Sequence, residues 1–231
     1  MTAPLVSCVV PVFNGEPYLH EALASIRAQT YRALEIIVVD DGSTDATKAV
    51  ARGCGDEVRY LWQPNAGPAA ARNLGIGSAT GDFIAFLDAD DLWHAEKLAR
   101  QMARFQTRPA LDLCLTHVQN FWTAELQDEG ERLRGHFRTQ PLPGYSSVAL
   151  LARRAVFERV GRYDPALRHG ADADWFARAE EQGAVCDLLA DVLVYRRVHA
   201  DNRSRIWSER SQEEILRVMR SIVQRRRAGA T

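Results

Sequence analysis

Short apolar runs alternate with amphipathic segments over the first 110 residues. Four runs are almost continuously hydrophobic and end at polar or glycine-containing turns: 5–13, 34–40, 58–63 and 82–88. Runs of this length and composition are typical of strands buried on both faces of a sheet. The three segments between them carry helix-start and helix-end signals: 16–30, 42–53 and 67–81. Strand–helix–strand units with short connections predict an α/β fold with a mostly parallel, Rossmann-like sheet and helices on both faces.

Polar or glycine residues follow the carboxyl end of each predicted strand. They are Phe13-Asn14-Gly15, Asp40-Asp41-Gly42, Asn65-Ala66-Gly67 and Asp88-Ala89-Asp90. Ligands of open parallel sheets bind beyond the carboxyl ends of the strands. If these residues were only surface loops, polar residues would be found at both ends of the strands. We therefore predict that the four loops line one ligand-binding crevice.

The second half of the chain is less regular. Residues 120–145 mix charge, glycine, proline and aromatics without a clear period, and we predict a mobile loop or lid there. A short strand and a helix ending at Gly161 follow, and then a helix from about Asp172 to Gly183. One or two strands come next, and the chain closes with an amphipathic helix rich in arginine.

Composition narrows the class of protein. The 231 residues are 46% hydrophobic and 26% charged with a formal charge of −1, so the protein has no general attraction for nucleic acid. No run approaches the ~20 apolar residues of a membrane-spanning helix, and the apolar start of the chain lacks a preceding basic stretch. The four cysteines form no CxxC pair, which favours reduced, structural thiols. We expect a cytoplasmic protein.

Three carboxylates, Asp88, Asp90 and Asp91, follow the fourth apolar run almost without a break. Residues two apart on an extended chain point the same way, so Asp88 and Asp90 can address one ligand. One or two carboxylates are enough for a hard divalent cation when a substrate brings phosphate oxygens. The alternative is a helix N-cap, because the following residues have a helical pattern. We assign the cap to Asp91 and the ligand to Asp88 and Asp90.

A second carboxylate pair, Asp40 and Asp41, ends the second strand. A turn followed by a helix cap explains residues 42–45, but it does not need two adjacent carboxylates. A carboxylate in a crevice can accept a hydrogen bond from the N3–H of a pyrimidine. The glycines of 67–81 lack the order and position of a dinucleotide-binding turn, so Arg72 is the better phosphate candidate in this helix.

Four stretches together resemble the family 2 glycosyltransferases, which have the GT-A fold. They are "VSCVVPVFNGEPYLHEALASIRAQT", "LEIIVVDDGSTD", "NAGPAAARNLGIGSATGDFIAFLDADDLW" and "GADADWFARA". The resemblance implies one GT-A domain, a nucleotide-diphospho-sugar donor that is usually UDP-linked, Mn²⁺ or Mg²⁺, and transfer with inversion. It divides the chain into a donor-binding half (1–110), an acceptor-binding half (111–205) and a C-terminal amphipathic helix (206–231).

The resemblance also assigns roles by position. It implies that Phe13 stacks on the base, that Asp41 binds the base, and that Asp90 holds the metal ion with His199. The residues that it places around the donor nucleotide and sugar are Pro11, Phe13, Asn14, Asp41, Asn65, Gly67, Arg72, Asp88 and Ala89. A cation bound there would stabilise the charge that develops on the leaving nucleoside diphosphate.

Inverting transfer to a hydroxyl needs a carboxylate that takes the hydroxyl proton. The resemblance implies that this base is Asp172, although the glutamate that precedes it in the family is Ala171 here. Asp174 is an alternative base, and Asp172 can also be a helix cap. In the same way, Arg196 or Arg197 is implied as a phosphate contact.

Other functions remain open at this point. A polyprenyl-phosphate sugar synthase of the same fold would transfer to a lipid phosphate and need no base. A nucleotide-sugar-binding protein without turnover is supported only by Ala171. The acceptor can be a saccharide, a lipid-linked molecule or a peptide. The arginine-rich tail can be a docking helix with a solvated face, a homodimer contact or a peripheral contact with the inner membrane face.

Overall fold

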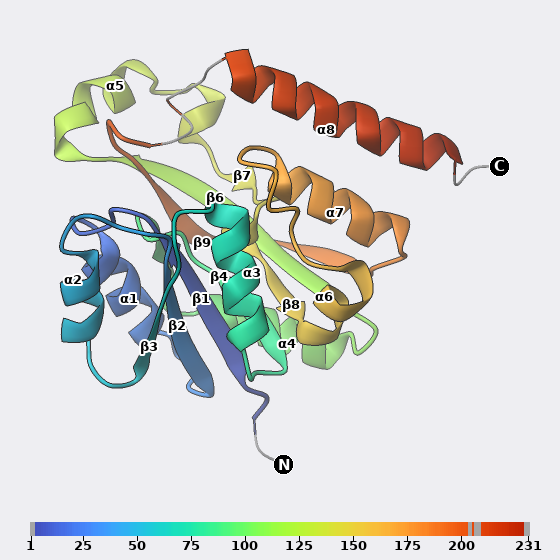
Figure 1. The fold of residues 1–231 in the computed structure, drawn as a ribbon, viewed down its shortest axis with the longest axis horizontal. Coiled ribbons are helices and arrows are strands. Elements are labelled where there is room, and N and C mark those ends of the chain that lie inside the picture. Colours follow the sequence, from blue (N-terminus) through green and yellow to red (C-terminus); the bar gives the residue numbers. More distant parts are fainter. Residues whose placement is uncertain (1–2, 203–204, 206–208, 229–231) are drawn as a thin grey trace.

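The structure, a computed structural model, describes residues 3–202, 205 and 209–228. Parts of the three predicted divisions lie outside the described residues, namely 1–2, 203–204, 206–208 and 229–231. One nine-stranded sheet forms the centre of the molecule, in the order β3-β2-β1-β4-β8-β6-β9-β5, with β7 paired to β6 (Figure 1). The strands are β1 (Val6–Val12), β2 (Leu34–Asp40), β3 (Val58–Trp62), β4 (Phe83–Phe86), β5 (Leu92–Trp93), β6 (Leu113–Trp122), β7 (Leu142–Pro143), β8 (Leu151–Arg153) and β9 (Cys186–Val198).

Helices cover both faces of this sheet. They are α1 (Leu19–Arg27), α2 (Thr47–Gly53), α3 (Pro68–Ser78), α4 (Lys97–Thr107), α5 (Gln127–Arg132), α6 (Arg154–Val160), α7 (Ala171–Glu181) and α8 (Glu209–Ala228), with 3-10 turns η1 (Ala124–Leu126), η2 (Phe137–Thr139) and η3 (Ser147–Ala149). One apolar core joins the sheet to α1 and α4, and a second joins it to α3, α6 and α7. The predicted α/β class with helices on both faces is confirmed.

The first half of the sheet is parallel, as predicted. β1 pairs in parallel with β2 and with β4, and β2 pairs in parallel with β3. Every residue of β1 and of β4 is buried, which agrees with their unbroken apolar sequences. The carboxyl ends of these four strands therefore meet at one edge of the sheet.

The second half of the sheet is mixed. β8 runs antiparallel to β4 and to β6, whereas β9 runs parallel to β6 with a register irregularity near His117. Val194 and Tyr195 of β9 also pair antiparallel with β5. This pairing brings the end of β9 beside Asp90 and Asp91, which come just before β5.

The helix predicted to begin at Asp91 was placed too early. Leu92–Trp93 form β5, and α4 begins only at Lys97. Asp91 is buried and accepts a hydrogen bond from the backbone N–H of Arg197 at 2.9 Å, so its predicted role as a helix cap was wrong. The cause is the long-range pairing of β5 with β9, which overrides the local helical pattern of this stretch.

Residues 120–145 are more regular than predicted. They contain η1, α5, η2 and β7, whereas the sequence has no clear period there, and a role as a mobile loop or lid stays a prediction. α5 lies against Trp122, where a Cβ placed on Gly130 would come within 3.1 Å of the indole. Glu129 of α5 also forms a two-bond ion pair with Arg205. The contact with Trp122 inside the segment and the ion pair with Arg205 outside it hold α5 in place.

The predicted C-terminal amphipathic helix is confirmed as α8. It packs on α7 with Val218 buried, and a Cβ placed on Gly170 would lie 3.5 Å from Val218 and 3.7 Å from Ile215. Arg225 strengthens this packing through ion pairs with Asp174 and Glu181. Within residues 3–202, 205 and 209–228, no helix is both long enough and apolar enough to cross a membrane.

Candidate functional site

The loops that follow β1 and β2 are hydrogen-bonded to each other. The Asn14 N–H donates to Ser43 Oγ at 2.9 Å, and Asn14 Oδ1 accepts from the Thr44 N–H at 2.8 Å. Asn14 has a φ of +51°, a conformation that asparagine tolerates better than most residues. Pro11 is buried in β1, whereas the neighbouring Phe13 is 52% exposed. The two loops thus hold an aromatic ring at the surface beside the carboxyl end of β1.

Asp41 organises the loop that follows β3. Its carboxylate accepts hydrogen bonds from Gln63 Nε2 at 2.6 Å and from the N–H groups of Ala66 and Gly67 at 2.9 and 2.8 Å. Asn65 Nδ2 donates to the Asp41 carbonyl at 3.0 Å. A carboxylate offers about four acceptor positions, and these bonds occupy three of them. Asp41, Asn65 and Gly67, three of the predicted residues, therefore lie together.

Arg72 of α3 links two of the predicted carboxylates. Its Nη2 donates to Asp88 Oδ1 at 2.9 Å, and its Nη1 lies 3.9 Å from Asp172 Oδ1. Burial lowers the pKa of Arg72, but Asp88 and Asp172 outweigh burial and hold it above its usual value. Asp88 and Asp172 are 84 positions apart in the chain, yet both lie within 4 Å of the Arg72 guanidinium.

Asp90 lies against the residues that follow β9. Asp90 Oδ2 is 3.0 Å from His199 Nε2 and accepts a hydrogen bond from Asn202 Nδ2 at 3.2 Å. Asn202 Oδ1 accepts in turn from the His199 N–H, so the amide joins both residues. Ala89, between the two aspartates, is 9% exposed. The predicted pair of Asp90 and His199 is therefore in contact, although 109 positions separate the two residues.

Arg197 fixes the position of the Asp90 loop. Its Nε donates to the Asp90 carbonyl at 2.9 Å, and its Nη2 donates to Glu21 at 2.6 Å. Its guanidinium also lies 4.7 Å from the ring centroid of Tyr18 and 4.8 Å from that of Phe121. These contacts hold the Arg197 side chain in place, and through its bond to the Asp90 carbonyl it supports the loop that carries Asp90.

Asp91 is buried beneath this loop. Burial raises its pKa well above the usual range, and the carboxylates of Asp90 and Asp88 raise it further. The hydrogen bond from the Arg197 N–H acts in the opposite direction. Asp91 therefore belongs to the support of the loop.

Asp172 lies in the first turn of α7 and is not its cap, because Gly170 with a φ of +73° is the N-cap residue. Asp172 Oδ2 accepts hydrogen bonds from the Ser147 N–H at 3.1 Å and from Ser147 Oγ at 3.3 Å. Asp172 Oδ1 has no hydrogen-bond partner in the described part of the chain. Asp174, the alternative base, is held in ion pairs with Arg178 and Arg225.

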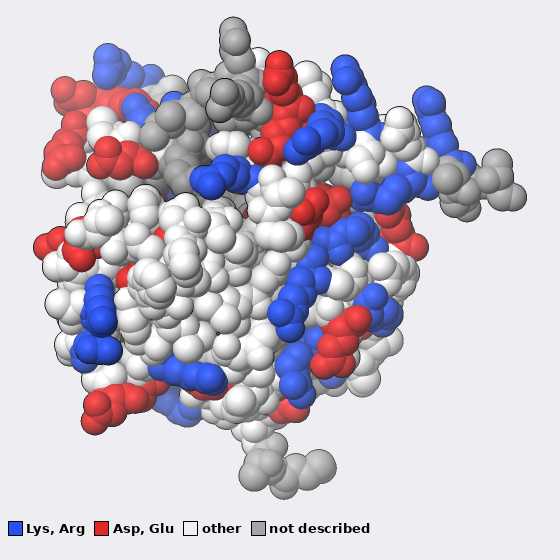
Figure 2. Space-filling view, in the orientation of Figure 1, with Lys and Arg blue, Asp and Glu red and all other residues white. Residues whose placement is uncertain are grey.

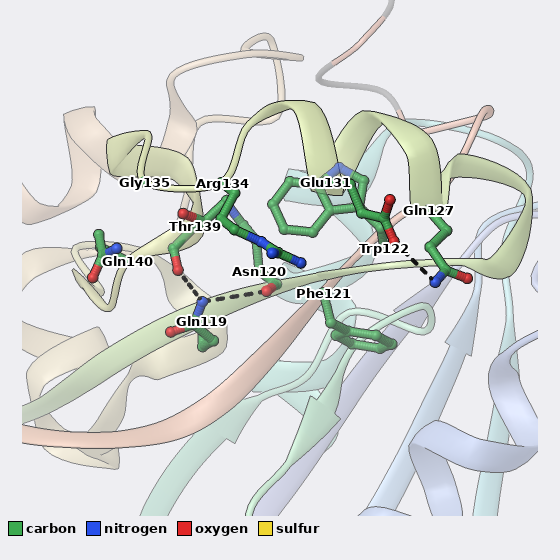
Figure 3. A pocket seen from close by; sticks show the side chains of 11 residues that line it. Gln119, Asn120, Phe121, Trp122, Gln127, Glu131, Arg134, Gly135, Thr139 and Gln140 are labelled. Carbon is green, nitrogen blue, oxygen red and sulfur yellow. Dashed lines mark hydrogen bonds between the residues drawn. The ribbon is translucent and has the colours of Figure 1, made fainter.

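A pocket of about 570 Å³ lies between α5 and the end of β6. Figure 3 shows Asn120 and Trp122 reaching from β6 toward Glu131 and Arg134 of the overlying segment. Its other walls are mostly amides and small residues: Gln119, Phe121, Gln127, Gly130, Gly135, Thr139 and Gln140. The segment 120–145 thus forms a polar pocket with aromatic side chains.

Several contacts of this site could not be predicted from a motif. Ser147 binds Asp172, and Asn202 binds Asp90, but neither lies in a stretch with a distinctive pattern. The only signal for Asn202 is its place three residues after His199, in a segment already singled out by the resemblance. For Ser147 we find no signal in the sequence.

Comparison with known proteins gives a family match and similar glycosyltransferases. The model of the family "Glycosyl transferase family 2" matches residues 7–161, which is more than half of the chain. An uncharacterized glycosyltransferase of Nostoc is 41% identical over 227 residues, which cover 90% of this chain and 70% of that protein. An uncharacterized glycosyltransferase of Rickettsia typhi is 31% identical over 208 residues, which cover 85% of this chain and 65% of that protein.

A solved structure shares the fold. The structure of S. aureus TarS 1-349 in complex with UDP-GlcNAc superposes with a TM-score of 0.77 at 22% identity, over 94% of this chain and 65% of that one. The chain spans about 65% of the length of two Rickettsia relatives and 32% of a third. On the evidence of the family match, the chain belongs to glycosyl transferase family 2.

Proposed function

We propose that the protein is an inverting glycosyltransferase that moves a sugar from a UDP-linked donor to an acceptor hydroxyl. The observation that carries this proposal is the link through Arg72 between Asp88, at the end of a donor-side strand, and Asp172. This link fixes the position of Asp172, the candidate base, relative to Asp88 on the side of the site where the sugar donor is proposed to bind. TarS, which has the same fold, was solved with UDP-GlcNAc, and this supports a UDP-sugar as the class of donor.

In this proposal residues 1–110 bind the donor and residues 111–205 bind the acceptor. The exposed ring of Phe13 stacks on the base, and the remaining acceptor position of Asp41 receives its N3–H. Asn14, Asn65 and Gly67 border the ribose. The remaining donor contacts are assigned to Pro11, Arg72, Asp88 and Ala89.

A divalent cation, Mn²⁺ or Mg²⁺, fits the residues present. Asp90 Oδ2 and His199 Nε2 are 3.0 Å apart and can share one ion once the imidazole nitrogen is free of its proton. The described ranges hold no group of three or more His, Cys, Asp or Glu that could bind an ion, so the diphosphate would supply further ligands. When bound, the ion neutralises charge on the leaving diphosphate.

Asp172 is the general base of the proposed reaction. Ser147 orients the carboxylate through Oδ2, and Oδ1 keeps its lone pairs for a proton. The acceptor oxygen gives its proton to Asp172 and forms a bond to the anomeric carbon, while the bond from that carbon to the diphosphate oxygen breaks.

The test is release of nucleoside diphosphate from a panel of nucleotide sugars with Mn²⁺ or Mg²⁺. Asp172→Asn should lower the rate by about 10²-fold or more. Asp174→Asn is the matched control, two residues away on the same helix, and should keep most of the rate. If no donor is hydrolysed, calorimetry with UDP and Mn²⁺ follows. Metal-dependent binding alone would leave an enzyme that awaits its acceptor, and no binding at all would reject the proposed donor.

The acceptor lies, in this proposal, in the pocket between α5 and β6. Amide groups with an aromatic side chain suit a saccharide, because sugars offer hydroxyls and an apolar ring face. A lipid-linked or peptide acceptor would need part of its length outside a pocket of about 570 Å³. The amides Asn120 and Gln140 are suitable positions for variants, since their replacement should change the acceptor KM more than the donor KM.

A second candidate is transfer to a lipid-linked acceptor at the inner membrane face by a cytoplasmic, peripherally bound enzyme. One observation favours it. Leu216, Met219 and Val223 of α8 are 52%, 58% and 48% exposed, and they follow one another along one side of the helix. Arg220 and Arg227 are exposed beside them, and Figure 2 shows the positive side chains along α8. Apolar residues flanked by arginines suit an anionic lipid surface.

Flotation with vesicles of phosphatidylglycerol and phosphatidylcholine tests this candidate. Met219→Ser should reduce binding, and Phe137→Ser should not, because Phe137 is similarly exposed but lies outside α8. A protein that stays in solution but sediments as a dimer, and loses the dimer in Met219→Ser, would assign the same residues to a homodimer contact.

A further inference from the structure

Three consecutive backbone carbonyls, the last two of η3 and that of the next residue, each accept a hydrogen bond from a buried side chain. The donors all come from one short stretch that includes β5 and α4. The three bonds are Trp93 Nε1 to Val148 O at 3.2 Å, Gln101 Nε2 to Ala149 O at 2.9 Å, and Lys97 Nζ to Leu150 O at 3.4 Å.

The donors form one connected group. Trp93, Lys97 and Gln101 are spaced four residues apart, which places Lys97 and Gln101 on the same face of α4. Lys97 Nζ donates to Gln101 Oε1 at 3.0 Å and lies 4.3 Å from the Trp93 ring centroid. Gln101 also donates to the Cys114 carbonyl at 2.7 Å. All three side chains are buried, so none of these bonds competes with water.

The carbonyls belong to the segment that holds the proposed base. Ser147, next to Val148, donates both its N–H and its hydroxyl to Asp172. The stretch that bears the donors also begins directly after Asp88 and Asp90. One piece of chain therefore carries Asp88 and Asp90 at its start and, through β5 and the beginning of α4, donates hydrogen bonds to the segment that supports Asp172.

Core packing does not explain why a lysine occupies position 97. It is fully buried, and its amine contacts no carboxylate among the residues that the structure describes. Placing an amine there is costly, while methionine would fill a similar volume without that cost. What the amine adds is a donor for Leu150 O and for Gln101 Oε1, which an apolar residue cannot provide.

We infer that Trp93, Lys97 and Gln101 are positioning residues for the transfer reaction: they hold the 147–150 segment so that Ser147 orients Asp172. The inference rests on the proposed role of Asp172 as the base. A shift of about 1 Å in a catalytic group can reduce a rate by about 100-fold, so small losses of this support are measurable.

Gln101→Met is the test variant, and Gln29→Met is its matched control. Gln29 is equally buried and also makes three hydrogen bonds around α4, to Ser25, His94 and Leu98, but none to residues 147–150. Gln101→Met should lower kcat about 10-fold to 100-fold with an unchanged donor KM. Gln29→Met should leave kcat within about 2-fold. Ser147→Ala should reproduce the effect of Gln101→Met.

A second readout does not depend on turnover. The Ser147 amide is bonded to Asp172, so its hydrogen exchange should become at least about 10-fold faster in Gln101→Met and stay unchanged in Gln29→Met. Equal effects of both variants on exchange or kcat, or no effect of Gln101→Met, would overturn the inference. If Ser147 exchange differs between Gln101→Met and Gln29→Met as expected but Asp172→Asn is fully active, Asp172 would be rejected as the base.

Discussion

Lys97 gives the protein a pH dependence of stability that one substitution should remove. Its amine is enclosed by Cys8 of β1, Cys114 of β6, the Trp93 ring and the Gln101 amide. Burial lowers the pKa of Lys97 to about 7 from a usual value of 10.5. Between these values the unfolded chain holds a proton that the folded chain has released. The free energy of unfolding therefore rises with pH in this window and is flat below it.

The size of the effect follows from the shift. Each pH unit inside the window contributes about 1.4 kcal/mol, so stability should gain on the order of 3 kcal/mol from Lys97 between pH 7 and 9. Burial raises the pKa of both Cys8 and Cys114 to about 12, and this works in the opposite direction once unfolded thiols ionise. The cysteines are present in wild type and in Lys97→Met, so their contribution cancels in the difference.

The assay is urea unfolding followed by tryptophan fluorescence at pH 7, 8 and 9 for wild type and Lys97→Met. Lys97→Met also leaves Leu150 O and Gln101 Oε1 without a donor, which costs about 1–3 kcal/mol each at every pH. Only the pH dependence of the difference in unfolding free energy between wild type and Lys97→Met is therefore diagnostic. A difference that stays constant within about 0.5 kcal/mol from pH 7 to 9 would refute the reasoning.

Three further predictions concern the donor loops and α8. Asp90→Asn should abolish the dependence of UDP binding on Mn²⁺, measured by calorimetry, while binding without metal persists; an unchanged metal dependence would assign the ion elsewhere. Gly42→Ala should destabilise the protein by about 1–3 kcal/mol in urea unfolding and weaken UDP binding, because Gly42 has a φ of +81° and a Cβ would lie 2.7 Å from the Asn65 nitrogen. Wild-type stability in this variant would contradict the turn geometry. Arg225→Ala should cost about 1 kcal/mol or less in thermal unfolding, since its ion pairs with α7 are partly exposed; a loss above about 3 kcal/mol would mean that α8 holds the fold together.

Sequence pattern alone was sufficient for the parallel half of the fold. β1, β2 and β4 are almost continuous apolar runs, and the sharp change to polar residues at their ends marks the edge of the sheet where we propose that the donor binds. Because parallel strands end at the same edge, the positions of Asp41 and Asp88 in the sequence are enough to place both on one side of the molecule. α3, α7 and α8 also followed from local signals, since helix caps and 3.6-residue spacing involve only near neighbours in the chain.

The tertiary structure alone decided the contacts made across the chain. β5 has two residues and exists only because it pairs with β9, so no local pattern could separate it from the helix that follows. His199 and Asp172 were placed by resemblance, but their partners Asn202 and Ser147 are set by the register of β9 and by the path of the 147–150 segment. The buried bonds of Lys97 and Gln101 depend on carbonyls about 50 positions away, where side-chain spacing carries no information. Periodicity predicts on which face of a helix or strand a side chain lies, whereas long-range packing decides which group becomes its hydrogen-bond partner.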